Sequence, residues 1–90
     1  MRIIILDGAE MTDRDVLHGY LKRELRFPEY YGNNLDALAD CLSELGPHTH
    51  IILTNAETLR TELGEYGERL IEVFKETASP GAYHFAIDGE

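Results

Sequence analysis

The sequence predicts one α/β domain with a small parallel sheet, and two observations support this fold class. Three short runs, residues 3–6, 50–54 and 83–87, have the β-branched or aromatic content of strands, and stretches with helical periodicity separate them. Parallel strands need a crossover of a dozen or more residues, which these helical stretches supply. We therefore expect two layers, a three-stranded parallel sheet packed with about four helices, in the order β-α-α-β-α-α-β.

The first strand and the first helix are predicted from residues 3–28. The run Ile-Ile-Ile-Leu at 3–6 is continuously apolar, which predicts a strand buried on both faces, and Asp-Gly ends it. Thr12 is the predicted N-cap of a helix over 13–25, which has acidic residues in its first turn. Pro28 stops this helix.

The second half of the chain continues the alternation. After the strand at 50–54, Asn55 is the predicted cap of a short helix that Gly64 ends. A turn at Ser79-Pro80-Gly81 precedes the last strand at 83–87. The helix between them, about 66–77, directs these apolar residues mostly toward a core: Leu70, Ile71, Val73, Phe74 and Ala78.

The composition is that of a compact acidic protein. Its 90 residues include 17 Asp and Glu but only 8 Lys and Arg, for a formal net charge of −9. This length allows a single domain, residues 1–90. So few scattered basic residues argue against nucleic-acid binding, whereas an acidic surface favours basic partners, metal cations or plain solubility.

Cysteine usage and hydropathy predict the compartment. Cys41 is the only cysteine, so no intramolecular disulfide can form. The apolar start is too short for a signal peptide, and no apolar run approaches the roughly 18 residues of a membrane span. We expect a cytoplasmic protein with no membrane partner.

Residues 27–42 are hard to explain as packing alone. Aromatic, Pro and Gly residues crowd the loop before a new helix, and two asparagines supply its N-cap. At 100° per residue, this helix separates an apolar arc from a polar one. The apolar arc contains Leu35, Leu38, Ala39, Cys41, Leu42 and Leu45, and the polar arc contains Asp36, Asp40, Ser43 and Glu44.

Two interpretations fit the polar arc. Asp36 and Asp40 lie one turn apart, where like charges repel by roughly a few tenths of a kcal/mol. A solvated acidic face is one interpretation. A protein interface is the other, because the adjacent Tyr30 and Tyr31 combine tyrosine with charge as interfaces do. We expect one of the two tyrosines, Tyr31, to be a core residue.

This segment resembles the signature of the barstar family of intracellular ribonuclease inhibitors. The shared pattern is Pro-x-Tyr-Tyr-Gly-x-Asn-Leu-Asp-Ala-Leu-x-Asp, beginning at Pro28, and a weaker likeness extends over the whole chain. The resemblance implies a barstar-like fold. It also implies a one-to-one complex with a basic, secreted, barnase-type (guanyl-specific) ribonuclease, whose active site the acidic helix and the preceding Tyr-Tyr-Gly loop block.

The resemblance further implies which residues contact the ribonuclease. By position, Asp40 is the central anion, which takes the place of an RNA phosphate among cationic and histidine side chains. Asp36 adds a second carboxylate, and Tyr30 packs at the rim. Gly32 occupies a position of close backbone approach. The remaining positions are Asn34, Ala39, Ser43 and Glu76.

Three departures from the family pattern leave an alternative open. Ala39 and Leu45 stand where large aromatic residues are found, and Asn33 replaces an acid. Because the acidic anchors remain while their apolar surroundings differ, the sequence does not identify the target ribonuclease. The alternative is an acidic protein-binding or self-associating module with a different basic partner, since an uncovered sheet edge can pair with another copy. Nothing else indicates a homo-oligomer.

Enzymatic and metal-binding functions have weaker support. Carboxylates on an open helix face stay ionised, so we expect no enzymatic activity. The residues His48-Thr49-His50 form a weak metal motif with no third ligand at a diagnostic spacing, so we expect no metal site and no cofactor. We expect His18 and His84 on amphipathic surfaces, and Cys41 as a small core residue.

Overall fold

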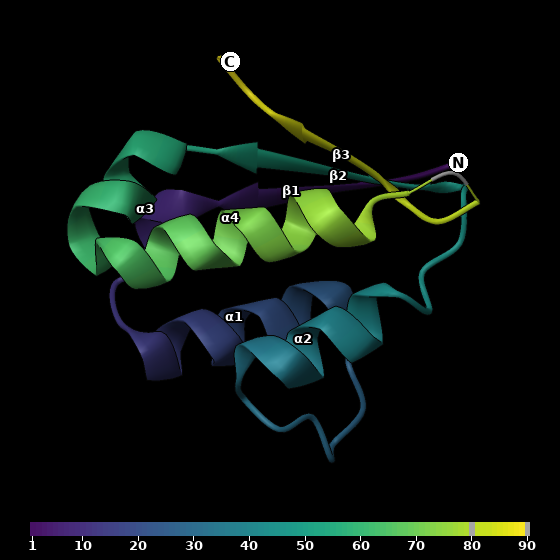
Figure 1. Cartoon of the computed structure of the whole chain (residues 1–90), viewed down its shortest axis with the longest axis horizontal. Coiled ribbons are helices and arrows are strands. Elements are labelled where there is room, and N and C mark those ends of the chain that lie inside the picture. Colours follow the sequence, from purple (N-terminus) through teal and green to yellow (C-terminus); the bar gives the residue numbers. More distant parts are fainter. Residues whose placement is uncertain (80, 90) are drawn as a thin grey trace.

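The computed structural model describes residues 1–79 and 81–89 and shows the predicted order of elements (Figure 1). The strands are β1 (Arg2–Asp7), β2 (Thr49–Thr54) and β3 (His84–Ile87). The helices are α1 (Arg14–Leu25), α2 (Leu35–Leu42), α3 (Ala56–Leu63) and α4 (Glu65–Thr77), and a short 3-10 helix, η1 (Gly8–Glu10), follows β1. The predicted α/β class and its order are confirmed.

The three strands form one parallel sheet with β2 in the centre. Its order is β1-β2-β3, and each strand is parallel to its neighbour. In register, Ile4 lies opposite Ile51, and Ile51 lies opposite Phe85. The helical pairs α1–α2 and α3–α4 are the two crossovers between the strands.

Only one face of the sheet is covered, because the helices pack on the same side of it (Figure 1). Along β1, Ile4 and Leu6 are buried, whereas Ile3 and Ile5 are each 58% exposed. The prediction that this strand is buried on both faces is therefore wrong. The continuous apolar run has the burial pattern of a strand with one open face, in which successive side chains point to opposite sides.

A side chain closes part of the outer edge of β1. The N–H of Arg2 donates to the His48 carbonyl, next to β2, at 2.8 Å. Every second residue of β1, counted from Arg2, therefore directs its backbone N–H and C=O toward β2, and the other residues direct these groups to the outer edge. Asp7 is one of the others, and its N–H donates to the hydroxyl of Tyr20 on α1 at 2.8 Å. Tyr20 thus satisfies a backbone donor that would otherwise lie at an open sheet edge.

The boundaries of α1 and α4 agree with prediction to within one residue. By contrast, α2 ends at Leu42, so Ser43, Glu44 and Leu45, which were predicted on its two arcs, follow the helix. The first predicted cap also differs. Asp13, rather than Thr12, is the N-cap of α1, and its Oδ1 accepts a hydrogen bond from the Val16 N–H at 2.9 Å. The extended backbone of Asp13 places its carboxylate over the first turn, where it satisfies a free amide.

The predicted cap of α3 also differs. Asn55 has a left-handed conformation (φ 53°) and makes no capping hydrogen bond; its Nδ2 donates instead to Asp7 Oδ1 at 2.7 Å. Gly64 ends α3 as predicted, with φ 53°. The turn predicted at 79–81 includes Pro80, which lies outside the described residues.

The core fills the space between the covered face of the sheet and the helices. Tyr31 belongs to the core, at 6% exposed, as predicted, whereas Cys41 is half-buried and packs at the margin of the core. The residues with no exposed surface are Leu6, Met11, Leu17, Leu21, Leu38, Leu42, Leu59 and Leu70.

None of the helices in the described part of the chain is long and apolar enough to cross a membrane.

Candidate functional site

The start of α2 is fixed by Asn34. Its backbone is extended, and its Oδ1 accepts a hydrogen bond from the Ala37 N–H at 2.7 Å. Its Nδ2 donates to the Gly32 carbonyl at 3.2 Å. The Asn34 side chain therefore ties the preceding loop to α2. The partner contact that the family resemblance implies for Asn34 stays a prediction.

Tyr31 anchors the loop before α2 in the core. Its ring centroid lies 4.8 Å from that of Phe27, and its N–H donates to the Pro28 carbonyl at 3.0 Å. The adjacent Tyr30 points outward and is 86% exposed. One tyrosine of the pair thus holds the loop while the other is free to contact a partner.

A buried histidine connects this loop to α4. His18 is 2% exposed, and its Nδ1 and Nε2 lie 2.7 Å from the hydroxyls of Tyr31 and Tyr66, respectively. The prediction that His18 lies on the surface is wrong, because two hydroxyl groups satisfy its ring nitrogens inside the protein. Burial lowers the pKa of His18 and raises the pKa of both tyrosines.

The polar arc of α2 is an exposed acidic face, as predicted. The carboxylates of Asp36 and Asp40 form no ion pair or hydrogen bond with other described residues. The Ser43 hydroxyl donates to the Asp40 carbonyl at 2.7 Å and so helps to close the helix end. Burial raises the pKa of the neighbouring Cys41, and the charges of Glu44 and Asp40 raise it further.

A groove of about 330 Å³ lies between α2 and α4. It brings together three residues predicted from the sequence, namely Asp36, Ala39 and Glu76. The other four lining residues were not predicted as site residues from the sequence: Leu35, Arg69, Glu72 and Val73. The spacing of 69, 72, 73 and 76 on one helix, at i, i+3, i+4 and i+7, is the signal that indicates a shared face.

Two arginines border the acidic face. A second hollow of about 360 Å³ adjoins the first and includes Arg14, Asn33, Tyr66 and Arg69. The guanidinium carbon of Arg14 lies 4.2 Å from the Tyr66 ring centroid, which holds that side chain over the aromatic face. The surface around Asp36 is therefore acidic with a basic border.

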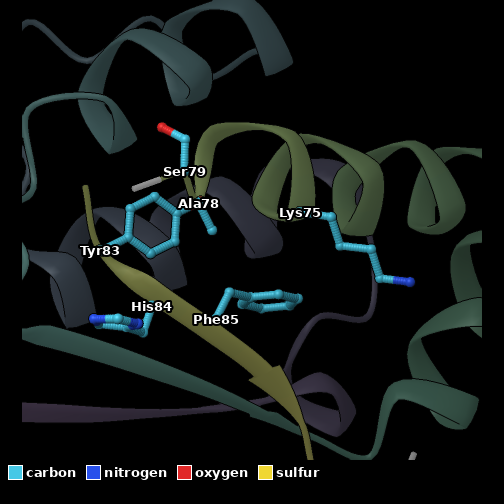
Figure 2. Close-up of a pocket in the computed structure, with 6 residues that line it drawn as sticks. All are labelled: Lys75, Ala78, Ser79, Tyr83, His84 and Phe85. Atoms are coloured by element: carbon cyan, nitrogen blue, oxygen red, sulfur yellow. The ribbon is translucent and has the colours of Figure 1, made fainter. Parts of the chain in front are cut away.

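Another hollow lies away from these residues, where the end of α4 meets β3 (Figure 2). It measures about 560 Å³ and has an aromatic wall of Tyr83 and Phe85, with Lys75 reaching from α4. None of the predicted site residues lines it. It shares no lining residue with the two hollows beside the acidic face.

The candidate site consists of an acidic helix face, an exposed tyrosine and a groove lined by apolar residues, three acidic residues and Arg69. Carboxylates fixed on a helix form charge-assisted hydrogen bonds with lysine or arginine on a partner. No group of three or more potential metal ligands occurs among the described residues. The arrangement is suited to binding a basic protein surface.

Comparisons with known proteins give a family and a relative to which this chain is similar. The sequence profile of the family described as "Barstar (barnase inhibitor)" matches residues 1–85. The chain is also similar to a protein of Bacillus subtilis (strain 168) named "Putative ribonuclease inhibitor YrdF". The two are 46% identical over 77 residues, which cover 84% of this chain and 85% of that protein.

Proposed function

The chain belongs to the barstar family, and on this premise we propose that it inhibits a basic, secreted ribonuclease of the barnase type. In this proposal, α2 and the loop at 30–32 cover the active site of the ribonuclease in a one-to-one complex. Membership of this family indicates an inhibitor and not an enzyme.

The unpaired carboxylates of Asp36 and Asp40 are the observation that most supports this function. A ribonuclease must hold the RNA phosphate with fixed cationic groups. A carboxylate on a rigid helix can bind the same groups, and the contact strengthens when water is excluded. We assign Asp40 the central position and Asp36 and Tyr30 the flanking contacts.

The groove between α2 and α4 supports a basic partner in particular. Its lining combines apolar residues (Leu35, Ala39 and Val73) with acidic residues (Asp36, Glu72 and Glu76) and one basic residue, Arg69. An arginine of the partner would suit this mixed lining, because its aliphatic stem packs on apolar surface while its guanidinium binds carboxylates. The small side chain of Ala39 leaves this volume for the partner to fill.

The net charge of −9 adds a longer-range contribution. It attracts a basic ribonuclease before contact, and this attraction is screened by salt. We therefore expect added salt to slow association more than it accelerates dissociation.

Titration calorimetry against a barnase-type ribonuclease, together with an RNA-cleavage assay, tests the proposal. The wild-type chain should bind one-to-one and abolish cleavage. Asp40→Ala should weaken binding by about 3–5 kcal/mol, because cationic groups of the ribonuclease are left buried and unpaired. Circular dichroism should show that the variant is folded, since Asp40 is exposed.

Glu62→Ala is the matched control. It removes the same charge from α3, where Glu62 is exposed and outside the candidate site. Its affinity should remain close to that of the wild-type chain. Absence of one-to-one binding by the wild-type chain, or equal losses in the two variants, would contradict the proposal.

A further inference from the structure

The structure places two histidines side by side on the open face of the sheet. His50 on β2 and His84 on β3 are directly opposite in register. Their ring centroids are 4.5 Å apart, and the ring planes are inclined by 25°. His84 is exposed at the start of β3, where Figure 2 shows its imidazole, and His50 is half-buried.

The separation of the two rings matches that of imidazoles on one metal ion. At a metal–nitrogen distance of about 2.1 Å, two imidazoles bound at a right angle have ring centroids about 4.5 Å apart. Stacked rings reach this arrangement when each turns about its Cβ–Cγ bond and directs a nitrogen to a shared point. The backbone positions of His50 and His84 therefore need not move.

The ring nitrogens are free to make this change. Within the described residues, neither His50 nor His84 has a hydrogen bond or an ion pair through its ring. On the other side of His50, the opposing residue of β1 is Ile3, which supplies no competing charge. A net charge of −9 also raises the local concentration of cations.

We propose that His50 and His84 form a two-imidazole site for a divalent transition-metal ion, with water completing the coordination. Imidazole ligands suit Ni²⁺, Cu²⁺ and Zn²⁺. From the sequence we expect no metal site, because no third ligand accompanies His48 and His50 at a diagnostic spacing. The fold supplies a different pair, since His84 comes from the next strand of the sheet.

The site has two consequences for the molecule. A bound ion links the edge strand β3 to the central strand β2, so it should stabilise the fold by binding the folded chain in preference to the unfolded one. It also leaves the acidic face free, because α4 lies between the sheet and α2 (Figure 1). Metal binding and the proposed ribonuclease binding are therefore independent.

Titration of the untagged chain with NiCl₂ at neutral pH tests the site by calorimetry. The wild-type chain should bind one Ni²⁺, and His50→Gln and His84→Gln should each lose at least about tenfold in affinity, because a chelating pair becomes a single ligand. His48→Gln is the matched control: His48 is exposed and lies two residues before His50. Its affinity should stay within about twofold of the wild-type value.

Thermal unfolding provides a second measurement. Ni²⁺ should raise the Tm of the wild-type chain, EDTA should reverse the shift, and His84→Gln should abolish it. No saturable binding by the wild-type chain would overturn the proposal. So would unchanged affinity in His84→Gln, or a loss in His48→Gln as large as in His50→Gln, which would place the ion on His48 and His50 instead.

Discussion

Tyr31→Phe tests the role assigned to the buried histidine with a change of one oxygen atom. The Tyr31 hydroxyl lies 2.7 Å from His18 Nδ1, and His18 is 2% exposed, so water cannot readily replace the lost partner. A buried polar atom left without a partner costs about 1–3 kcal/mol. For a chain of this size, each 1 kcal/mol lowers the Tm by about 4–8 °C.

Urea denaturation monitored by circular dichroism is the appropriate assay. The midpoint should fall while the slope of the transition stays constant, which shows that stability and not compactness has changed. Tyr30→Phe is the matched control, because Tyr30 is adjacent, 86% exposed and lacks a hydrogen bond to any described residue. Equal midpoints for the two variants would refute the assigned role of the His18–Tyr31 hydrogen bond.

Three other predictions follow from local features. Burial lowers the pKa of His18 from 6.5, so on acidification the unfolded chain takes up a proton before the folded chain does. The free energy of unfolding should therefore fall as the pH drops below about 6.5. Measurements of Tm against pH should show this fall, and His18→Gln should make the fall smaller. Asn34→Ala should lower the free energy of unfolding, measured by chemical denaturation, by about 1 kcal/mol, because the α2 cap is lost. Asn34→Asp should keep most of the capping stability, because a carboxylate oxygen can accept the same hydrogen bond. Gly8→Ala should destabilise the fold by about 1–3 kcal/mol, because the added Cβ would lie 2.5 Å from the Asn55 carbonyl oxygen. Gly19→Ala should stabilise it by roughly 0.5–1 kcal/mol, because the added Cβ on α1 would meet no atom within 4 Å apart from its chain neighbours and the backbone of its own helix.

Features that depend on local periodicity could be predicted from the sequence. The helix at 35–42 repeats apolar residues at helical spacing, so its buried and exposed sides follow from the pattern alone. Leu38 and Leu42 are buried while Asp36 and Asp40 are exposed, as the pattern indicates. The order of strands and helices also follows, because each element has its own composition.

Features that depend on tertiary packing could not be predicted in this way. The apolar run of β1 has no alternation, so nothing in it reveals that all helices cover one face and leave Ile3 and Ile5 exposed. His18 is polar, and its burial is acceptable only because hydroxyls 13 and 48 residues away meet its ring. Glu72 joins the groove through the packing of α4 on α2, which no single-helix pattern describes.

The all-parallel sheet also determines the order in which this chain can fold. Arg2 pairs with Thr49 and His50 pairs with His84, so an entire helical pair lies between the partners in each ladder. No hairpin is available to nucleate the sheet, and each ladder requires closure of a long loop before its first hydrogen bond forms. The helices contain only local hydrogen bonds and can form early, so amide protons of α1 and α4 should become protected from exchange before those of β1 and β3.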